Sequence, residues 1–196
     1  MAKRIILAVV GLLGSGKSTA VDSLKRHGFE VIELGDIWRE LLKKNHIPRS
    51  DAVATREFTL RIRETEGKDV YARYAFKKIR KGQMRIAITG LRSTYEMAYL
   101  KKRIQNLKIV ALHAPLKLRY KRFALRGKPE DPKTLKMFKW LEGREKKGFM
   151  KAKSEERHGV MHIIKQADYV IANTGTVTKL HRDMLKIIKS IEAEKR

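Results

Sequence analysis

Near its start the chain carries an apolar run that passes directly into a glycine-rich loop. Residues 11–18 read GLLGSGKS and match the pattern G-x-x-x-x-G-K-[ST] at every fixed position. The glycines allow successive backbone N–H groups to turn around a phosphate, and a helix that follows adds the positive end of its dipole. This Walker A motif predicts a strand, a loop and a helix that together bind the phosphates of a nucleotide.

The residues of this loop have expected roles in nucleotide binding. Lys17 supplies a positive charge to the β- and γ-phosphates, and the Ser18 hydroxyl is placed to ligate magnesium. The motif does not distinguish ATP from GTP. The residues of this segment that we expect to bind the nucleotide are Gly11, Leu12, Leu13, Gly14, Ser15, Gly16, Lys17, Ser18 and Thr19.

Length and composition fit one globular domain. The 196 residues include 42% hydrophobic residues and no cysteine, so a sizeable core is possible and a disulfide framework is not. No apolar stretch approaches the roughly 20 residues needed to cross a bilayer. We therefore expect a cytoplasmic protein, a monomer or homodimer, with no membrane partner.

The chain is strongly basic, with a formal net charge of +25. Residues 101–158 contribute 19 basic and 6 acidic side chains, which is about half of the excess. A field of this size favours polyanionic partners or substrates. Two interpretations remain open, namely a basic face that binds phosphates or RNA, and a Lys-rich solvated surface of the kind found in proteins from hot environments.

Short runs rich in Ile and Val alternate with helical patterns, which is typical of a parallel sheet covered by helices on both faces. The candidate strands are residues 5–10, 30–34, 85–89, 108–113 and 169–172. The sequence therefore predicts an α/β fold with a five-stranded parallel sheet. Ligands of such folds bind at the carboxyl ends of the strands, so the residues that follow each strand should share one crevice.

Two stretches depart from the alternation of strands and helices. Residues 36–81 hold about three helical segments and no convincing strand, which favours a helical flap over the substrate. Residues 127–153 are basic, contain several glycines and prolines, and have little apolar periodicity, which suits a lid over the nucleotide. We expect one P-loop domain over residues 1–196 that includes both insertions.

Phosphoryl transfer requires positioned positive charge, a metal ion and a group that orients or deprotonates the acceptor. Asp36, just past the second strand, is placed to face the acceptor and magnesium, to cap a helix predicted over residues 37–43, or to do both. Arg92, past the third strand, is placed to bind a substrate phosphate. Arg63 and Arg73 either contact the substrate or make surface pairs at helical spacing.

Further candidates follow the later strands. Arg122 belongs to a basic helix after the fourth strand, and at least one arginine of the lid side is expected to reach the nucleotide phosphates. A solvated face is the alternative for each of them. Asn173 and Gly175 follow the last strand, where they either border the nucleotide base or form a simple turn.

Taken together, these segments resemble small P-loop kinases related to dephospho-CoA kinase and adenylate kinase, and most of all an archaeal branch of that group. The Walker A motif is shared by many NTPases, whereas the ordered set of segments is more specific. The matching segments span nearly the whole chain: residues 11–18, 33–40, 90–93 with Glu96, 114–115 followed by 119–122, 143–145 and 167–175.

The resemblance implies a nucleoside-monophosphate-kinase-like fold with a core, a flap and a lid. It also implies that Asp36 is the acid near the acceptor and that Arg92 and Arg144 bind phosphates. One position departs from the pattern, because Thr89 stands where these kinases usually carry an acid before the glycine. Magnesium would then depend on Ser18, Asp36 and water.

We therefore expect a magnesium-dependent phosphotransferase that moves the γ-phosphoryl group of ATP to a small phosphorylated acceptor such as dephospho-CoA or a nucleotide. The alternative is an RNA-associated NTPase or nucleotide switch that uses the basic 101–158 face. A third interpretation, a nucleotide-binding regulator without transfer activity, rests on Thr89. The residues expected to be catalytic are Lys17, Asp36, Arg92 and Arg144.

Overall fold

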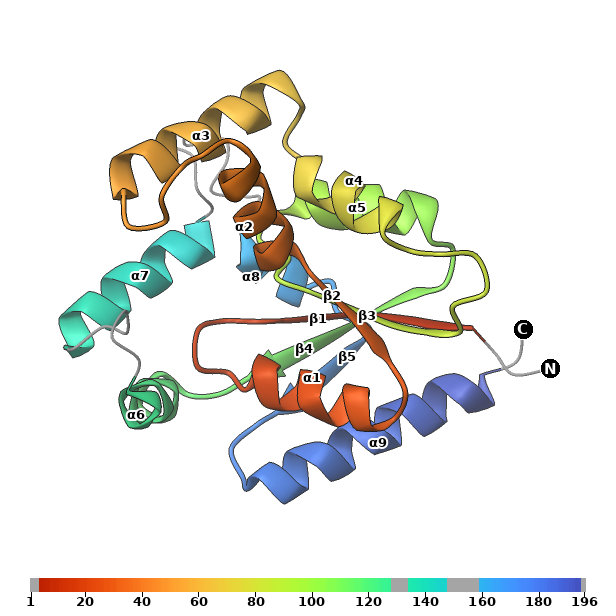
Figure 1. The fold of residues 1–196 in the computed structure, drawn as a ribbon. Coiled ribbons are helices and arrows are strands. Elements are labelled where there is room, and N and C mark those ends of the chain that lie inside the picture. Colours follow the sequence, from red (N-terminus) through yellow and green to blue (C-terminus); the bar gives the residue numbers. More distant parts are fainter. Residues whose placement is uncertain (1–3, 128–133, 148–158, 195–196) are drawn as a thin grey trace.

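A computed structural model describes residues 4–127, 134–147 and 159–194, apart from the side chains of residues 144–147. Its centre is a five-stranded parallel sheet with the strand order β2-β3-β1-β4-β5 (Figure 1). The predicted α/β class is confirmed, and all five predicted strands are present with ends that differ by at most one residue. The strands are β1 (Ile5–Gly11), β2 (Glu30–Glu33), β3 (Arg85–Thr89), β4 (Leu107–His113) and β5 (Tyr169–Ala172).

Alternate residues of β1 face two separate apolar cores, because successive side chains of a strand point to opposite faces of the sheet. Ile5, Leu7 and Val9 pack with α1 (Lys17–Arg26) and α9 (Val177–Ala193), which lie below the sheet in Figure 1. The intervening residues of β1 pack on the other face with α2 (Leu34–Lys44), α3 (Ala52–Thr65), α4 (Val70–Lys77), α5 (Thr94–Arg103) and α8 (Val160–Ile164). The Walker A loop therefore leaves a strand that is buried along its whole length.

The segment predicted as a substrate flap is helical, as expected, and consists of most of α2 together with α3 and α4. The predicted start of its first helix is wrong. Because β2 stops at Glu33 and Leu34 is buried in the core, α2 begins at Leu34. Asp36 therefore lies inside the first turn of α2 and does not cap a helix over residues 37–43.

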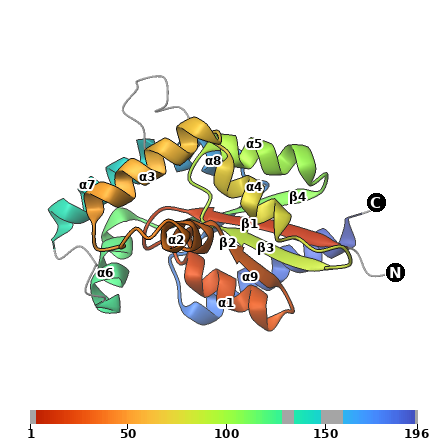
Figure 2. The same cartoon turned by 45° about the horizontal axis from the view of Figure 1, so that its top comes forward.

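Two helices extend the molecule beyond the carboxyl edge of the sheet. Both views place α6 (Leu116–Arg126) and α7 (Leu135–Lys147) at the end opposite to the chain's N-terminus (Figures 1 and 2). Phe138 of α7 is fully buried, and its ring centroid lies 5.4 Å from that of Phe123 on α6. The stretch predicted as a lid thus contains a packed helix. Its residues 128–133 and 148–153 lie outside the described residues.

The described residues of the basic run over residues 101–158 do not form one face. Residues 101–103 end α5 beside the start of β4, whereas α6 and α7 follow the carboxyl end of β4 (Figure 1). The two described parts of the run therefore lie at opposite ends of β4. Among the helices of the described segments, none is both long enough and apolar enough to cross a membrane.

Candidate active site

The Walker A loop needs glycine at two positions for steric reasons. Gly14 and Gly16 adopt φ angles of 72° and 101°, which are strained for residues with a Cβ. A Cβ on Gly14 would lie 2.5 Å from the carbonyl oxygen of Arg119, and one on Gly16 would collide with the side-chain amide of Asn173. The backbone of α6 and the side chain of Asn173 thus pack directly against the loop, and these contacts fix its shape.

The loop and the helix behind it fit a chain of phosphates. Lys17 Nζ donates to the carbonyl oxygens of Gly11 and Leu12 at 2.5 and 3.1 Å, so its charge lies within the loop. In this part of the chain, α1 begins without a side-chain cap and without an acidic residue in its first turn. The first N–H groups and the positive end of the helix dipole are consequently available for an anion.

Three residues predicted to bind the nucleotide form one network with the loop. Asn173 Nδ2 donates to the carbonyl oxygen of Ser15 at 2.8 Å. Arg122 Nη1 donates to the carbonyl oxygen of Asn173 at 3.0 Å, and Arg122 Nη2 approaches that of Gly175 at 3.4 Å. The end of β5 and helix α6 therefore hold the Walker A loop in place. Their contact with a nucleotide remains a prediction.

Arg119 organises the same region, although its role was not predicted. It is only 4% exposed, donates to the carbonyl oxygens of Ala114 and Leu13 at 2.8 and 3.1 Å, and pairs with Glu142 at 2.6 Å. The side chain thus connects the Walker A loop with α6 and α7. Nothing in the sequence distinguishes Arg119 from the other basic residues of its helix, because its partner Glu142 lies on a separate element.

A pocket of about 450 Å³ opens at the carboxyl ends of β2 and β3. Because β3 pairs with β1, whose carboxyl end carries the Walker A loop, the pocket lies at the same edge of the sheet as that loop. Its lining includes the aromatic side chains Trp38 and Tyr71. Its charged lining residues in the described part of the chain are five arginines and two acids, namely Arg39, Arg49, Arg56, Arg63, Arg92, Glu33 and Glu96. A small molecule with anionic groups and an apolar part suits this lining.

Arg92, predicted to bind a phosphate, lines this pocket with an exposed side chain. Its backbone position is fixed, because its N–H donates to Glu96 Oε2 at 2.7 Å. Ser93 and Glu96 form a capping box at the start of α5. The backbone of Arg92 is therefore held in place, and its side chain lies at the pocket.

Arg63 also reaches the pocket wall, but its charge is already balanced inside the protein. It is 7% exposed, and its Nη2 lies 3.2 Å from Glu96 Oε1. Burial raises the pKa of the Glu96 carboxyl above its ordinary value, and the positive charge of Arg63 opposes that shift. The guanidinium also lies 5.4 Å from the ring centre of Tyr71. Arg63 thus shapes the pocket, and a substrate contact remains a prediction.

The substrate contact expected for Arg73 does not agree with its position. Arg73 Nη1 lies 3.5 Å from Asp69 and its Nη2 lies 3.8 Å from Glu66, so it makes the surface pairs that were the alternative. Tyr71 and Ala72 are the buried side of this helix. The register of α4 therefore turns residue 73 away from the residues that line the pocket.

Asp36 is an exposed carboxylate, and it pairs with Arg39 one turn further along α2. Ser18 is the second residue of α1 and is also exposed. Within the described residues there is no group of three or more acidic or histidine side chains that could hold a metal. Magnesium often takes only one or two protein ligands and completes its shell with substrate phosphates and water. Ser18 and Asp36 fit such a site, and their roles remain predictions.

Arg144 and Thr89 are the remaining two positions that the sequence singled out. Arg144 belongs to α7, but its side chain lies outside the described part of the chain, so its phosphate contact is still a prediction. Thr89 ends β3, and its Oγ1 donates to the carbonyl oxygen of Val9 at 3.3 Å. It is buried, so the position before Gly90 contributes a hydrogen bond between β3 and β1 and no charge.

Glu33 is a second candidate acid that the sequence analysis did not single out. It ends β2, pairs in register with Thr89, and lines the pocket, whereas Asp36 is absent from the lining. Its Oε1 lies 3.8 Å from Arg39. The sequence feature that could have identified Glu33 is its place at the carboxyl end of a strand, where side chains enter the crevice of a parallel sheet.

The sheet, the Walker A loop and the surrounding helices define a P-loop nucleotide-binding fold of the kinase type. The chain belongs to a family described as an AAA domain, whose sequence profile matches residues 7–151. It is 33% identical over 187 residues to a UPF0200 protein of Sulfurisphaera tokodaii, in an alignment that covers 95% of this chain and 97% of that protein.

Two solved structures show the same fold at low sequence identity. The protein TT1252 from Thermus thermophilus superimposes with a TM-score of 0.63 and 17% identity, covering 96% of this chain and 98% of that one. A dephospho-CoA kinase from Campylobacter jejuni gives a TM-score of 0.55 and 15% identity, with coverages of 96% and 97%. At these identities the likeness shows the fold alone.

Proposed function

We propose that this protein is a magnesium-dependent phosphotransferase that moves the γ-phosphoryl group of ATP to a small phosphorylated acceptor. The main support is the arginine-lined pocket at the same edge of the sheet as the Walker A loop. A protein that only hydrolyses or senses a nucleotide has no need for a second anion site of about 450 Å³ beside the first. Dephospho-CoA and nucleoside monophosphates are acceptors of suitable chemistry.

The residues divide the reaction between two sites. Lys17 and the N-terminus of α1 bind the triphosphate, while Arg92, with Arg49 and Arg56 on the pocket rim, binds the acceptor's phosphate. An acceptor hydroxyl or phosphate oxygen attacks the γ-phosphorus, the bond to the β,γ-bridging oxygen breaks, and ADP leaves. A carboxylate at the pocket receives the proton when the acceptor is a hydroxyl. Alignment and charge stabilisation supply the catalysis.

Ser18 and Asp36 are the residues that would hold magnesium, which neutralises charge on the β- and γ-phosphates when bound. Thr89 offers no carboxylate for this purpose. The protein would therefore contribute two groups to the magnesium site, the Ser18 hydroxyl at the start of α1 and the Asp36 carboxylate on α2. To bind the metal, Asp36 must first break its ion pair with Arg39.

The proposal is tested by measuring ADP release from ATP and magnesium with a panel of acceptors. The panel contains dephospho-CoA, the four ribonucleoside monophosphates, and the unphosphorylated nucleosides as controls. We expect one phosphorylated acceptor to increase ADP release at least about tenfold. Its unphosphorylated counterpart should have little effect, because it has no phosphate for Arg92 to bind. ADP release that is the same with every acceptor would contradict a transferase.

The two carboxylates at this edge can be separated by mutation. If Glu33 is the general base, Glu33→Gln should lower kcat about 10²-fold or more with little change in the KM for ATP, and Asp36→Asn should mainly weaken the dependence on magnesium. Steady-state kinetics at several magnesium concentrations measure both effects. Glu40→Gln, on the same helix as Asp36 and paired with Lys78 at 2.7 Å, is the matched control. Normal turnover in Glu33→Gln would return the role of base to Asp36.

A further inference from the structure

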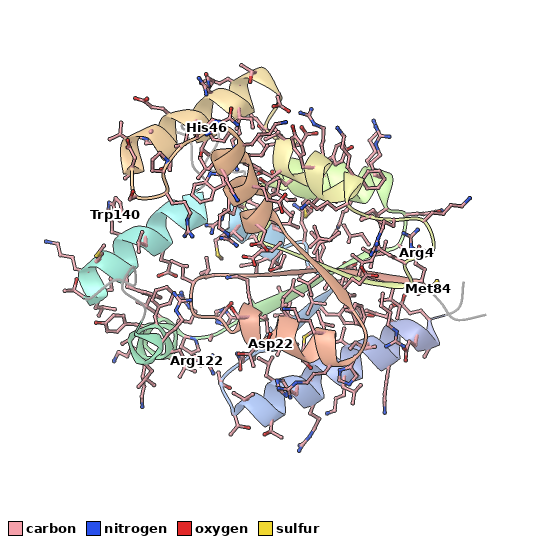
Figure 3. The ribbon with its side chains drawn as sticks, viewed as in Figure 1. Arg4, Asp22, His46, Met84, Arg122 and Trp140 are labelled. Carbon is pink, nitrogen blue, oxygen red and sulfur yellow. The ribbon has the colours of Figure 1, made fainter. Side chains whose placement is uncertain are left out.

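A second pocket lies at the amino edge of the sheet, away from the candidate active site. It has a volume of about 400 Å³ and is lined by Arg4, Arg80, Lys81 and Arg103, together with apolar side chains and two amides. Arg4 directly precedes β1, whose other end is the Walker A loop. At about 3.3 Å per residue, the seven residues of β1 place the two sites about 20 Å apart. In Figure 3, Arg4 and Met84 lie at this end, while Arg122 and Trp140 lie at the other.

The cations of this pocket come from three separate segments and face few carboxylates. Arg80 pairs with Glu30 at 3.0 Å, whereas Arg4 donates to the carbonyl oxygen of Gln83 at 2.9 Å. The guanidinium of Arg103 lies 5.5 Å from the ring centre of Tyr99. Among the described residues that line the pocket there is no carboxylate. Its interior therefore favours a negatively charged occupant.

Further basic residues stand next in sequence to those that line the pocket. The exposed lysines Lys77, Lys78, Lys101 and Lys102 lie at the carboxyl ends of α4 and α5, two helices that pack together. Within the described part of the chain, these four and the four cations of the pocket form ion pairs with two carboxylates, Glu30 and Glu40, and the two helix ends add about half a negative charge each. An excess of about five positive charges remains after these are subtracted. This excess positive charge is larger than the charge needed to balance the two helix ends. The cations that carry it are also spread over a larger area than a small ion would occupy.

The apolar part of the pocket suits a flat ring. Its walls include Ile6, Phe76, Ile79 and Ile104, and the amides of Gln105 and Asn106 stand at the same site. The rings of Phe76 and Tyr99 meet edge to face at 6.2 Å. Such a combination of aromatic and apolar surface, amides and a basic rim binds an unpaired base together with the phosphates on either side of it.

We propose that this amino-edge pocket and its basic rim bind single-stranded nucleic acid, with one base in the pocket and the flanking phosphates on the cations around it. A base can enter a pocket of this size only when it is unpaired, so a duplex should bind poorly. The site uses residues 4, 6, 76–81 and 101–106 and no residue of the Walker A loop or of the arginine-lined pocket. It is therefore separate from the proposed phosphotransferase site, and either proposal can fail without the other.

The test measures the fluorescence anisotropy of a fluorescein-labelled uridine 12-mer with the full-length protein. With four phosphates contacted, affinity should fall about 50-fold between 50 and 200 mM salt. Lys81→Glu combined with Arg103→Glu should lower affinity at least about tenfold and reduce the salt slope by about 1.4. Lys186→Glu with Lys189→Glu, two exposed positions on α9, makes the same change in net charge and should leave affinity within about twofold.

Three results would overturn the proposal. One is the absence of binding at 50 mM salt. Another is an equal loss in both double variants, which would mean that only net charge matters. The third is equally effective competition by a 12-base-pair duplex or by inorganic polyphosphate, which would show that no unpaired base is recognised. Thermal unfolding of both double variants checks that each is folded, and unchanged ADP release in the Lys81 and Arg103 variant would support the separation of the two sites.

Discussion

Phosphoryl transfer by the Lys17→Ala variant is expected to be at least about 10²- to 10³-fold slower than that of the wild type, the usual cost of removing one preorganised positive donor from a phosphoryl-transfer site. Lys17 is the charge that lies inside the Walker A loop, where it contacts two backbone carbonyl oxygens. The Lys17 side chain belongs to neither apolar core, and alanine is a good helix former, so the fold should remain intact. The measurement is kcat with ATP and the best acceptor of the panel, together with the midpoint of thermal unfolding.

A matched control for this variant lies on the same helix. Lys25 is an exposed lysine near the end of α1, so Lys25→Ala removes the same side chain away from the loop and should leave turnover within about twofold. If Lys17→Ala retains most of the wild-type rate, the Walker A loop does not bind the transferred phosphate. The phosphotransferase proposal would then be wrong, whatever the arginine-lined pocket binds.

Removal of the negative charge of Glu96 should produce the largest loss of stability. Glu96 pairs with Arg63 at the floor of the arginine-lined pocket, and both side chains are almost completely buried. Glu96→Gln keeps the size of the side chain but removes the negative charge that balances buried Arg63, and breaking a buried ion pair in this way typically costs about 3–5 kcal/mol. Guanidinium unfolding at neutral pH measures this as a lower free energy of unfolding.

The double variant Arg63→Gln with Glu96→Gln distinguishes loss of the ion pair from loss of the helix cap. Removing both charges together should cost less than Glu96→Gln alone, because no uncompensated charge is then buried. Ser93→Ala, which weakens the capping box without changing any charge, should cost about 1 kcal/mol. If Glu96→Gln costs no more than Ser93→Ala, the buried ion pair contributes little to stability, because glutamine can keep the capping box.

The fold was largely predictable because it depends on local patterns. Buried parallel strands appear as short apolar runs, so all five were found, and the Walker A motif located the nucleotide end of the sheet. The start of α2 was misplaced because Asp36 looks like a helix cap, whereas the burial of Leu34 decides the boundary. Packing overrode a local preference at that point.

The candidate site was only partly predictable, because several of its contacts join elements far apart in the sequence. Arg92 and the flap arginine Arg63 were expected near a substrate, and both line the pocket. Their sequence neighbourhoods do not reveal that Arg63 is balanced by Glu96 or that Arg119 is buried against Glu142. The basic run over residues 101–158 also looked continuous, although β4 carries its two parts to opposite ends of the molecule.

The contact between Gly16 and the side chain of Asn173 has a consequence for engineering. The amide of Asn173 occupies the space that a Cβ at position 16 would need, and it also donates to the carbonyl oxygen of Ser15. The loop cannot therefore be transplanted into another scaffold as an isolated octapeptide. A functional graft must carry the tip of the last strand with it, so these two distant parts of the chain behave as one exchangeable module.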